Sequence, residues 1–112
     1  MAGIFVLDRA AILQRLGGDE EIYDMMVAMF LDDVDNNCAA LSAAFAAADP
    51  QSVQREAHTI KGLLATFSDD EGASAAMSIE SAARSGSLAG LAGAIGNIQL
   101  RLHEVATALG KR

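Results

Sequence analysis

The sequence predicts an all-α fold, an up-and-down antiparallel four-helix bundle with a short N-terminal helix. The composition is the first observation. Hydrophobic residues make up 52% of the chain but are dominated by alanine, aromatic residues make up 4%, and Pro50 is the only proline. Alanine, leucine, methionine and glutamate lose little conformational freedom in a helix. The second observation is that apolar residues recur at helical spacing between short breaks, which favour antiparallel neighbours.

A short helix and a long helix open the chain. Asp8 is placed to cap a helix that runs to about Leu16, where a Gly-Gly pair stops it. Asp19 then caps a long helix with acidic residues in its first turn, where the helix dipole favours them. This helix ends at Asp49 and Pro50. Its apolar stripe comprises Ile22, Met26, Met29, Phe30, Val34, Cys38, Leu41 and Phe45.

Three further helices follow. The third is expected from about Gln51 to Phe67, and the polar cluster at 68–71 is a turn or the start of the next helix. The fourth covers roughly Asp70 to Arg84 and ends at the Ser-Gly-Ser break at 85–87. The last helix carries a stripe formed by Leu88, Leu91, Ile95, Ile98, Leu102, Val105 and Leu109.

Length and cysteine content point to one intracellular domain. Residues 1–112 fall near the usual size of a single domain. The lone cysteine, Cys38, cannot form an internal disulfide and is expected to be a small buried apolar residue. The apolar stretch Ala2–Leu7 is too short to span a bilayer and lacks the preceding basic residues of a signal peptide. We therefore expect a cytoplasmic protein.

The charge distribution argues against two classes of partner. The formal net charge is -7, and between Leu16 and Gln54 there are eight acidic residues and no basic one. A phosphate backbone or an anionic lipid surface would be repelled by such a surface. Nucleic acid and membranes are therefore not expected as partners.

His58 occupies an unusual position on the third helix. On a helical wheel, the face opposite His58 consists of Val53, Ile60, Leu63, Leu64 and Phe67, and this face must pack into the bundle. His58 therefore points away from the core. Its own face is polar and mildly basic, and comprises Gln51, Gln54, Arg55, Lys61, Gly62 and Ala65.

Two neighbours of His58 suggest that this face has a chemical role. Gly62 lies in a helix interior, where glycine costs about 0.5 to 1 kcal/mol relative to alanine, and its missing side chain would let another protein reach the imidazole. Lys61 is placed to neutralise negative charge that arrives at the ring. A free imidazole is a competent nucleophile near neutral pH. The alternative interpretation, in which His58 is an ordinary surface histidine beside an ordinary lysine, stays open because the HxxKG string alone is only moderately specific.

These residues resemble a known family, the histidine-containing phosphotransfer (HPt) domain of multistep two-component signalling. The segment Ala57–Gly62, AHTIKG, is similar to the family's phosphorylation-site pattern AHxLKG. Leu16–Asp33 resembles the family's second helix with its preceding Gly-Gly-Asp, and Ala46–Gln51 resembles the turn before the histidine helix. Ile79 and Glu80, with the small residues that follow, match the next helix. The resemblance covers nearly the whole chain.

The resemblance implies a phosphorelay intermediate, a phosphoprotein that accepts a phosphoryl group on His58 from a receiver-domain aspartyl phosphate and passes it to another receiver. It implies that Lys61 stabilises the phosphoryl charge and that Gly62 gives the receiver access. One departure is the residue pair before the fourth helix, where the family often has Gly-Ala and this chain has Ser68 and Asp69. Asp69 lies nearer the His58 face on the wheel. The predicted partner-contacting residues are therefore Gln54, Arg55, Gly62, Ala65 and Asp69.

The resemblance also implies partners and cofactors. Receiver domains and a hybrid sensor histidine kinase are the expected partners. No cofactor or metal is expected on this chain, whereas Mg²⁺ is expected on the partner receiver domain. The chain should be a phosphoryl carrier and not an enzyme with ATP-dependent kinase activity. A monomer is expected, because the bundle closes its own core.

Alternative functions remain. The first is a non-catalytic helical interaction module that docks a receiver or another signalling protein without phosphoryl transfer. The methionines at 25, 26, 29 and 77 would suit such an adaptable surface, although methionines at helical spacing are more often core filler. A metal-binding bundle is the alternative from another class, but His58 and His103 form neither an HxxxH nor an ExxH pair. His103 is expected to be a surface or boundary residue.

Overall fold

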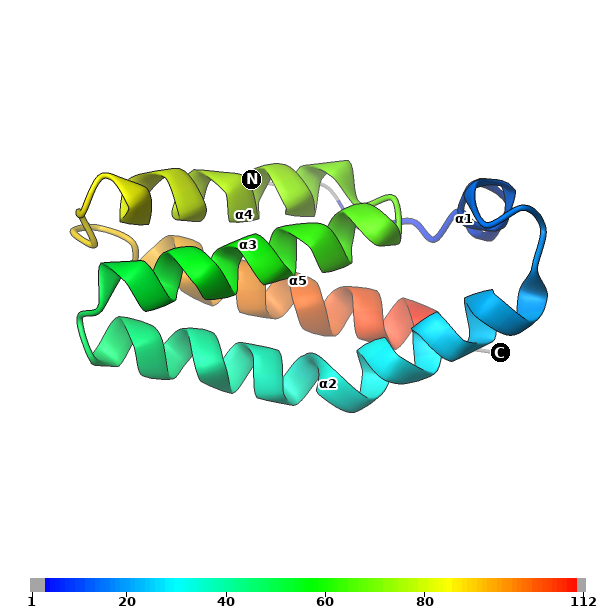
Figure 1. Cartoon of the computed structure of the whole chain (residues 1–112), viewed down its shortest axis with the longest axis horizontal. Coiled ribbons are helices and arrows are strands. Elements are labelled where there is room, and N and C mark those ends of the chain that lie inside the picture. Colours follow the sequence, from blue (N-terminus) through cyan, green and yellow to red (C-terminus); the bar gives the residue numbers. More distant parts are fainter. Residues whose placement is uncertain (1–3, 111–112) are drawn as a thin grey trace.

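The computed structural model describes residues 4–110, which leaves the first two residues of the apolar stretch Ala2–Leu7 outside the described range. Within this range the chain contains helices and no strand. The helices are α1 (Arg9–Arg15), α2 (Glu20–Ala46), α3 (Pro50–Thr66), α4 (Asp70–Arg84) and α5 (Ala92–Gly110). Four of them, α2 to α5, run alternately up and down along the long axis, and α1 lies across one end (Figure 1). The predicted four-helix bundle with a short N-terminal helix is confirmed.

Aspartates start four of the five helices. Asp8, Asp19, Asp49 and Asp69 are the N-cap residues of α1 to α4, and each carboxylate accepts a hydrogen bond from a backbone N–H in the first turn. This bond satisfies a donor that has no partner inside the helix. The local signal is strong, so these four helices begin at or within one residue of the predicted positions. Pro50 occupies the first turn of α3, where its missing N–H costs nothing.

The structure corrects the expected start of the last helix. Leu88 and Leu91 lie before α5, which begins at Ala92. Gly90 between them has a φ of 76°, a left-handed conformation that a helix cannot contain. Both leucines nevertheless pack against the core from the connecting loop. Their apolar character reflects burial and not helix formation.

The N-terminal half of α2 is rotated relative to the predicted stripe. Tyr23 and Val27 are buried there, whereas Ile22 is 41% exposed and Met29 is 58% exposed. From Phe30 onward the stripe is as predicted and includes the buried Cys38. The rotation leaves a row of apolar side chains on the surface of α2.

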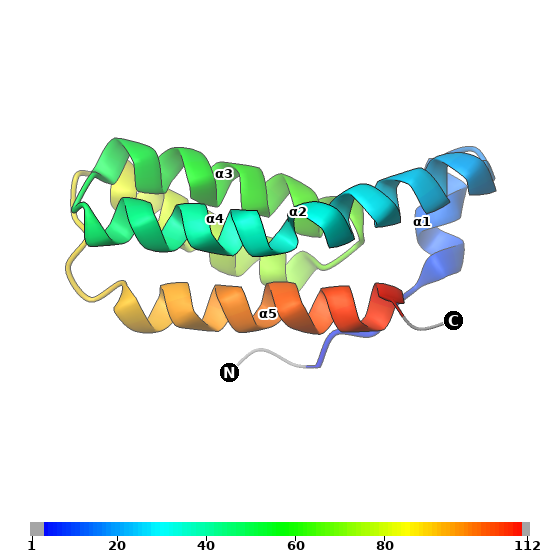
Figure 2. The same ribbon diagram turned by 90° about the horizontal axis from the view of Figure 1, so that it is seen from below.

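The core lies between the four long helices, and the ring of Phe30 on α2 meets that of Phe67 edge to face, with 5.3 Å between centroids. Neighbouring helices pack in the ring order α2, α3, α4, α5, as the view from below shows (Figure 2). The largest fully buried side chains are Ile12, Phe30, Leu41, Val53, Ile60, Leu64, Phe67, Ile79, Ile98, Leu102 and Val105. Burial of large apolar side chains of this kind is the main stabilising contribution.

Two polar contacts fix the end of the bundle where α1 lies. Arg15 of α1 donates hydrogen bonds to the carbonyl oxygens of Ala65 and Thr66, which holds α1 against the end of α3. Arg101 of α5 forms two hydrogen bonds of 2.7 Å to the carboxylate of Asp69 at the start of α4. A planar guanidinium paired with both oxygens of one carboxylate fixes orientation as well as distance.

Candidate functional site

His58 lies in the middle of α3 with its ring outside the core. The residues on the inner face of this helix, among them Ala57 and Ile60, are almost fully buried. The imidazole side chain is 66% exposed. The helical period therefore places the ring on the surface, as predicted.

The ring is nevertheless held by a buried carboxylate. Nδ1 of His58 lies 3.0 Å from Oε2 of Glu80, which belongs to the neighbouring helix α4. The Glu80 side chain is only 5% exposed. A buried acid on a helix of the core is uncommon unless it is paired, and this one is paired at the surface of α3.

The partner of Nδ1 determines the tautomer of the imidazole. An ionised carboxylate can only accept a hydrogen bond, so Nδ1 carries the proton and donates it to Glu80. In the neutral ring the lone pair then resides on Nε2. His58 therefore presents Nε2 as its nucleophilic atom.

Two cationic side chains also contact the same carboxylate. Nζ of Lys61 forms an ion pair with Oε1 at a distance of 2.9 Å. An Arg84 guanidinium nitrogen lies 3.0 Å from Oε2, the oxygen that His58 also contacts. The pKa of Glu80 is held below its ordinary value by Lys61 first and by the His58 hydrogen bond second, against the desolvation that burial imposes. Glu80 is therefore ionised at neutral pH.

An open cavity of about 440 Å³ lies beside the ring. Of the predicted partner-contacting residues, Gln54 and Arg55 line it together with His58 and Glu80. Gln51 and Thr59 complete its wall. The cavity gives a group bound at the imidazole space on the side of α3 that leads toward its N-terminus.

On the C-terminal side of His58, the surface of α3 carries only small side chains and is open. Gly62 is exposed one turn after His58, and a Cβ atom built there would meet nothing within 4 Å outside the local helix backbone. Ala65 is also exposed, although its carbonyl oxygen accepts the hydrogen bond from Arg15. No packing inside this part of the chain therefore requires a glycine at position 62, and the space above it is available to another molecule.

One predicted contact residue is wrong. Asp69 was expected on the partner-contacting face, but it is only 3% exposed. Its carboxylate caps α4 through the N–H of Gly72 and pairs with Arg101. The helical-wheel prediction for Asp69 was wrong because α3 ends at Thr66, so the helical projection does not extend to position 69.

Glu80 matches the family's pattern in the sequence, but no role was predicted for it, and Arg84 was not predicted as a site residue. The sequence nevertheless contains a pattern that marks Glu80 as unusual. Glu80 lies on the buried face of α4 with Gly72, Ala76, Ile79 and Ala83. A charged residue on an otherwise apolar helix face requires a partner, and that requirement could have marked it.

Other parts of the described chain lack this arrangement. His103 is exposed on α5, as predicted, and its ring nitrogens contact the carbonyl oxygen of Gln99 and the carboxylate of Asp35.

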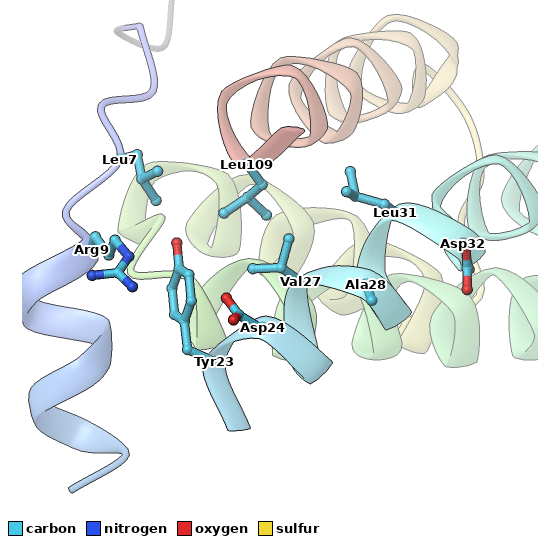
Figure 3. Close-up of a pocket in the computed structure, with 9 residues that line it drawn as sticks. All are labelled: Leu7, Arg9, Tyr23, Asp24, Val27, Ala28, Leu31, Asp32 and Leu109. Carbon is cyan, nitrogen blue, oxygen red and sulfur yellow. The ribbon is translucent and has the colours of Figure 1, made fainter. Parts of the chain in front are cut away.

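A cavity of about 480 Å³ lies between the N-terminal segment, α2 and the end of α5 (Figure 3), and it shares no lining residue with the cavity beside His58. Residues 4–110 contain no group of three metal-ligating side chains and no helix that could cross a membrane.

The chain matches a known protein family. The Hpt domain family matches residues 25–108, which include His58, Lys61, Glu80 and Arg84. No curated protein sequence matches the chain.

Two solved structures share the fold. Histidine-containing phosphotransfer protein B from Pseudomonas aeruginosa is 23% identical, with a TM-score of 0.82 over 92% of this chain and 90% of that chain. The Hpt domain of a sensor hybrid histidine kinase from Shewanella is 18% identical, with a TM-score of 0.79 over 92% of this chain and 89% of that chain. At these identities the likeness establishes the four-helix architecture.

Proposed function

Since this chain belongs to the Hpt domain family and is a phosphotransfer intermediate of a phosphorelay, we propose that His58 is the residue that carries the phosphoryl group. The observation that supports this most is the pairing of an exposed imidazole with the buried carboxylate of Glu80. This pairing keeps the proton on Nδ1 and leaves the lone pair on Nε2. His103, the other histidine, has an exposed aspartate at its ring instead.

The transfer step follows from this tautomer. Nε2 attacks the phosphorus of a receiver's aspartyl phosphate in line with the bond to the aspartate oxygen. The N–P bond forms as the P–O bond breaks, and the bonding electron pair leaves with the aspartate carboxylate. The ring gains positive charge in this step, and Glu80 stabilises it through the Nδ1–H hydrogen bond. The reverse step returns the phosphoryl group to another receiver.

Lys61 and Arg84 have separate parts in the proposal. Both ion pairs share the single negative charge of Glu80. A phosphoryl group on Nε2 adds further negative charge beside them, so both cations can interact with it without leaving Glu80 unpaired. Lys61 is 25% exposed and Arg84 is 60% exposed, so either side chain can turn toward the surface.

The partners and setting of the reaction belong to the same proposal. Hpt domains exchange phosphoryl groups with receiver domains and hybrid kinases, and this chain is proposed to act as a carrier without ATP-dependent kinase activity of its own. Mg²⁺ would be bound by the receiver, where it neutralises charge on the phosphoryl group. Gln54, Arg55, Gly62 and Ala65 would contact that receiver. A cytoplasmic monomer fits this role.

The experiment that tests the proposal is phosphoryl transfer from a phosphorylated receiver domain, with Mg²⁺, to the wild-type chain and to His58→Gln. Label is expected only on the wild type, and it should be acid-labile and alkali-stable, as phosphohistidine is. His103→Gln is the matched control, because it removes the other exposed histidine and should accept label normally. Label on His58→Gln would overturn the assignment.

A further inference from the structure

Tyr23 of α2 is buried, but its hydroxyl group lacks a hydrogen-bond partner. The residue is only 6% exposed, and the hydroxyl forms no hydrogen bond to any residue in the range 4–110. Buried polar groups are rarely left unpaired, because burial removes them from water. The hydroxyl points toward the space between Leu7 and Leu109, at the wall of the cavity of about 480 Å³ (Figure 3). A molecule bound in this cavity can therefore supply the missing partner.

The cavity has the size and the lining of a small-molecule site. Such sites usually have volumes of about 300 to 1,000 Å³ and walls that are mostly apolar with a few polar groups. The volume of this cavity lies within that range. Its apolar wall comes from the N-terminal segment, α2 and the end of α5, and comprises Leu7, Val27, Ala28, Leu31 and Leu109. No residue of α3 contributes to it.

Two carboxylates make the cavity acidic. Asp24 and Asp32 both line it, and both are exposed. They are eight residues apart on α2, so they lie on the same face of the helix, with the small Ala28 one turn from each. Within residues 4–110 neither carboxylate forms an ion pair with a basic side chain. Both are therefore available to a cationic ligand.

The one basic residue of the lining is already engaged. Arg9 pairs with Glu20, which lies outside the cavity, and its guanidinium lies over the ring of Tyr23 at 5.0 Å from the centroid. Its charge is thus offset by a partner of its own, whereas the charges of Asp24 and Asp32 are not. The lining therefore favours a cation over an anion.

We propose that this cavity is a second binding site of the chain, for a small primary amine with an apolar body. The ammonium group donates hydrogen bonds to the Tyr23 hydroxyl oxygen and the Asp24 carboxylate. The apolar body covers Leu31, which is 38% exposed at the cavity wall. The site goes beyond the proposed function, because it shares no lining residue with the cavity beside His58 and does not depend on which residue carries the phosphoryl group.

Titration of the intact chain with phenethylamine, followed by ¹⁵N–¹H correlation spectra, tests the site. The amide signals of Tyr23, Asp24 and Leu109 should shift, with a Kd on the order of 1 mM for a ligand of this size. 3-Phenylpropionate has the same phenyl ring and a carboxylate in place of the ammonium group, so it should bind at least about tenfold more weakly. No binding of the amine, equal binding of the two compounds, or shifts away from the cavity would overturn the proposal.

Variants separate the ligand contacts from the fold. Tyr23→Phe removes only the hydroxyl, so it should weaken phenethylamine binding about three- to tenfold and leave the urea midpoint unchanged. A lower urea midpoint with unchanged amine binding would overturn the proposal, because it would show that the hydroxyl serves the fold.

Asp24→Asn should weaken amine binding by about tenfold. Asp33→Asn is the matched control, because it removes the same charge from an exposed residue of α2 outside the cavity. Its affinity for phenethylamine should stay within about twofold of wild type, since salt screens charges that do not contact the ligand. Equal affinities of Asp24→Asn and Asp33→Asn would overturn the assignment of the ammonium contact and with it the amine site.

Discussion

Oε2 of Glu80 lies 3.0 Å from Nδ1 of His58, although the glutamate is buried and the histidine is exposed. The two residues are on adjacent helices and 22 positions apart. The orientation of a surface side chain is thus set from inside the bundle. This relationship makes Glu80 a positioning residue for the proposed phosphoryl carrier.

The first prediction concerns the tautomer. Glu80→Gln keeps the size of the side chain but removes the charge that selects the Nδ1–H form, and charge-assisted hydrogen bonds are about twice as strong as neutral ones. Transfer from a phosphorylated receiver should slow by about tenfold, which corresponds to about 1.4 kcal/mol. Ring ¹⁵N chemical shifts should show an increased population protonated at Nε2. An unchanged tautomer population with a slow transfer rate would instead indicate a structural effect.

The second prediction concerns acid stability. The pKa of Glu80 is lowered in the folded protein from an ordinary value of 4.5. Between the folded and ordinary values the unfolded chain binds the proton and the folded chain does not, so stability falls as pH drops. Below about pH 5 the stabilisation of wild type relative to Glu80→Gln should therefore shrink as the pH falls. Urea unfolding of both proteins at each pH measures it, and a difference that grows as the pH falls below about 5 would contradict it.

The third prediction concerns the buried ion pair. Asp69→Ala removes the carboxylate that accepts two hydrogen bonds from Arg101 and that caps α4 through the N–H of Gly72. Removal of one partner of a buried ion pair should cost about 3 kcal/mol or more, and loss of the cap adds about 1 kcal/mol. Arg9→Ala, which breaks the exposed pair with Glu20, is the control and should cost much less. Urea midpoints that are equal for the two variants would show that the Asp69 pair is not a major contribution.

The parts of the fold that the sequence predicted depend on local signals. Asp19 and Asp49 cap helices through bonds to residues three positions ahead, so their role is visible in the sequence. The exposure of His58 follows from the period of α3, because the neighbouring apolar residues fix which face is inward. Signals of this kind need no knowledge of tertiary structure.

The parts that were missed depend on packing between helices. The contact of Glu80 with His58 joins α4 to α3, and no local spacing encodes which helix face meets which. The exposure of Met25 and Met29 follows from the rotation of α2, where Tyr23 and Val27 are buried instead. Both sets of residues are apolar, so the sequence alone does not distinguish them.

The last prediction separates stability from function at Gly62. A Cβ at this position meets nothing within 4 Å, and the backbone has no positive φ there. Gly62→Ala should therefore stabilise the bundle by about 0.5 to 1 kcal/mol, because alanine loses less entropy in a helix. The added methyl group nevertheless projects into the space that a receiver needs, so phosphoryl transfer from a receiver should slow. Labelling of His58 by phosphoramidate, a small phosphodonor that needs no receiver contact, should continue.

Gly96 on α5 provides the matched control for Gly62, because its Cβ would also meet nothing within 4 Å. Gly96→Ala should give a similar gain in the free energy of unfolding with no change in transfer. Urea unfolding and single-turnover transfer, measured on both variants, check the pair of outcomes. If Gly62→Ala is stabilised and transfers as fast as Gly96→Ala, then access to His58 does not explain the glycine. Slower transfer in Gly62→Ala alone would mean that the chain gives up stability at this position to keep its phosphoryl carrier accessible.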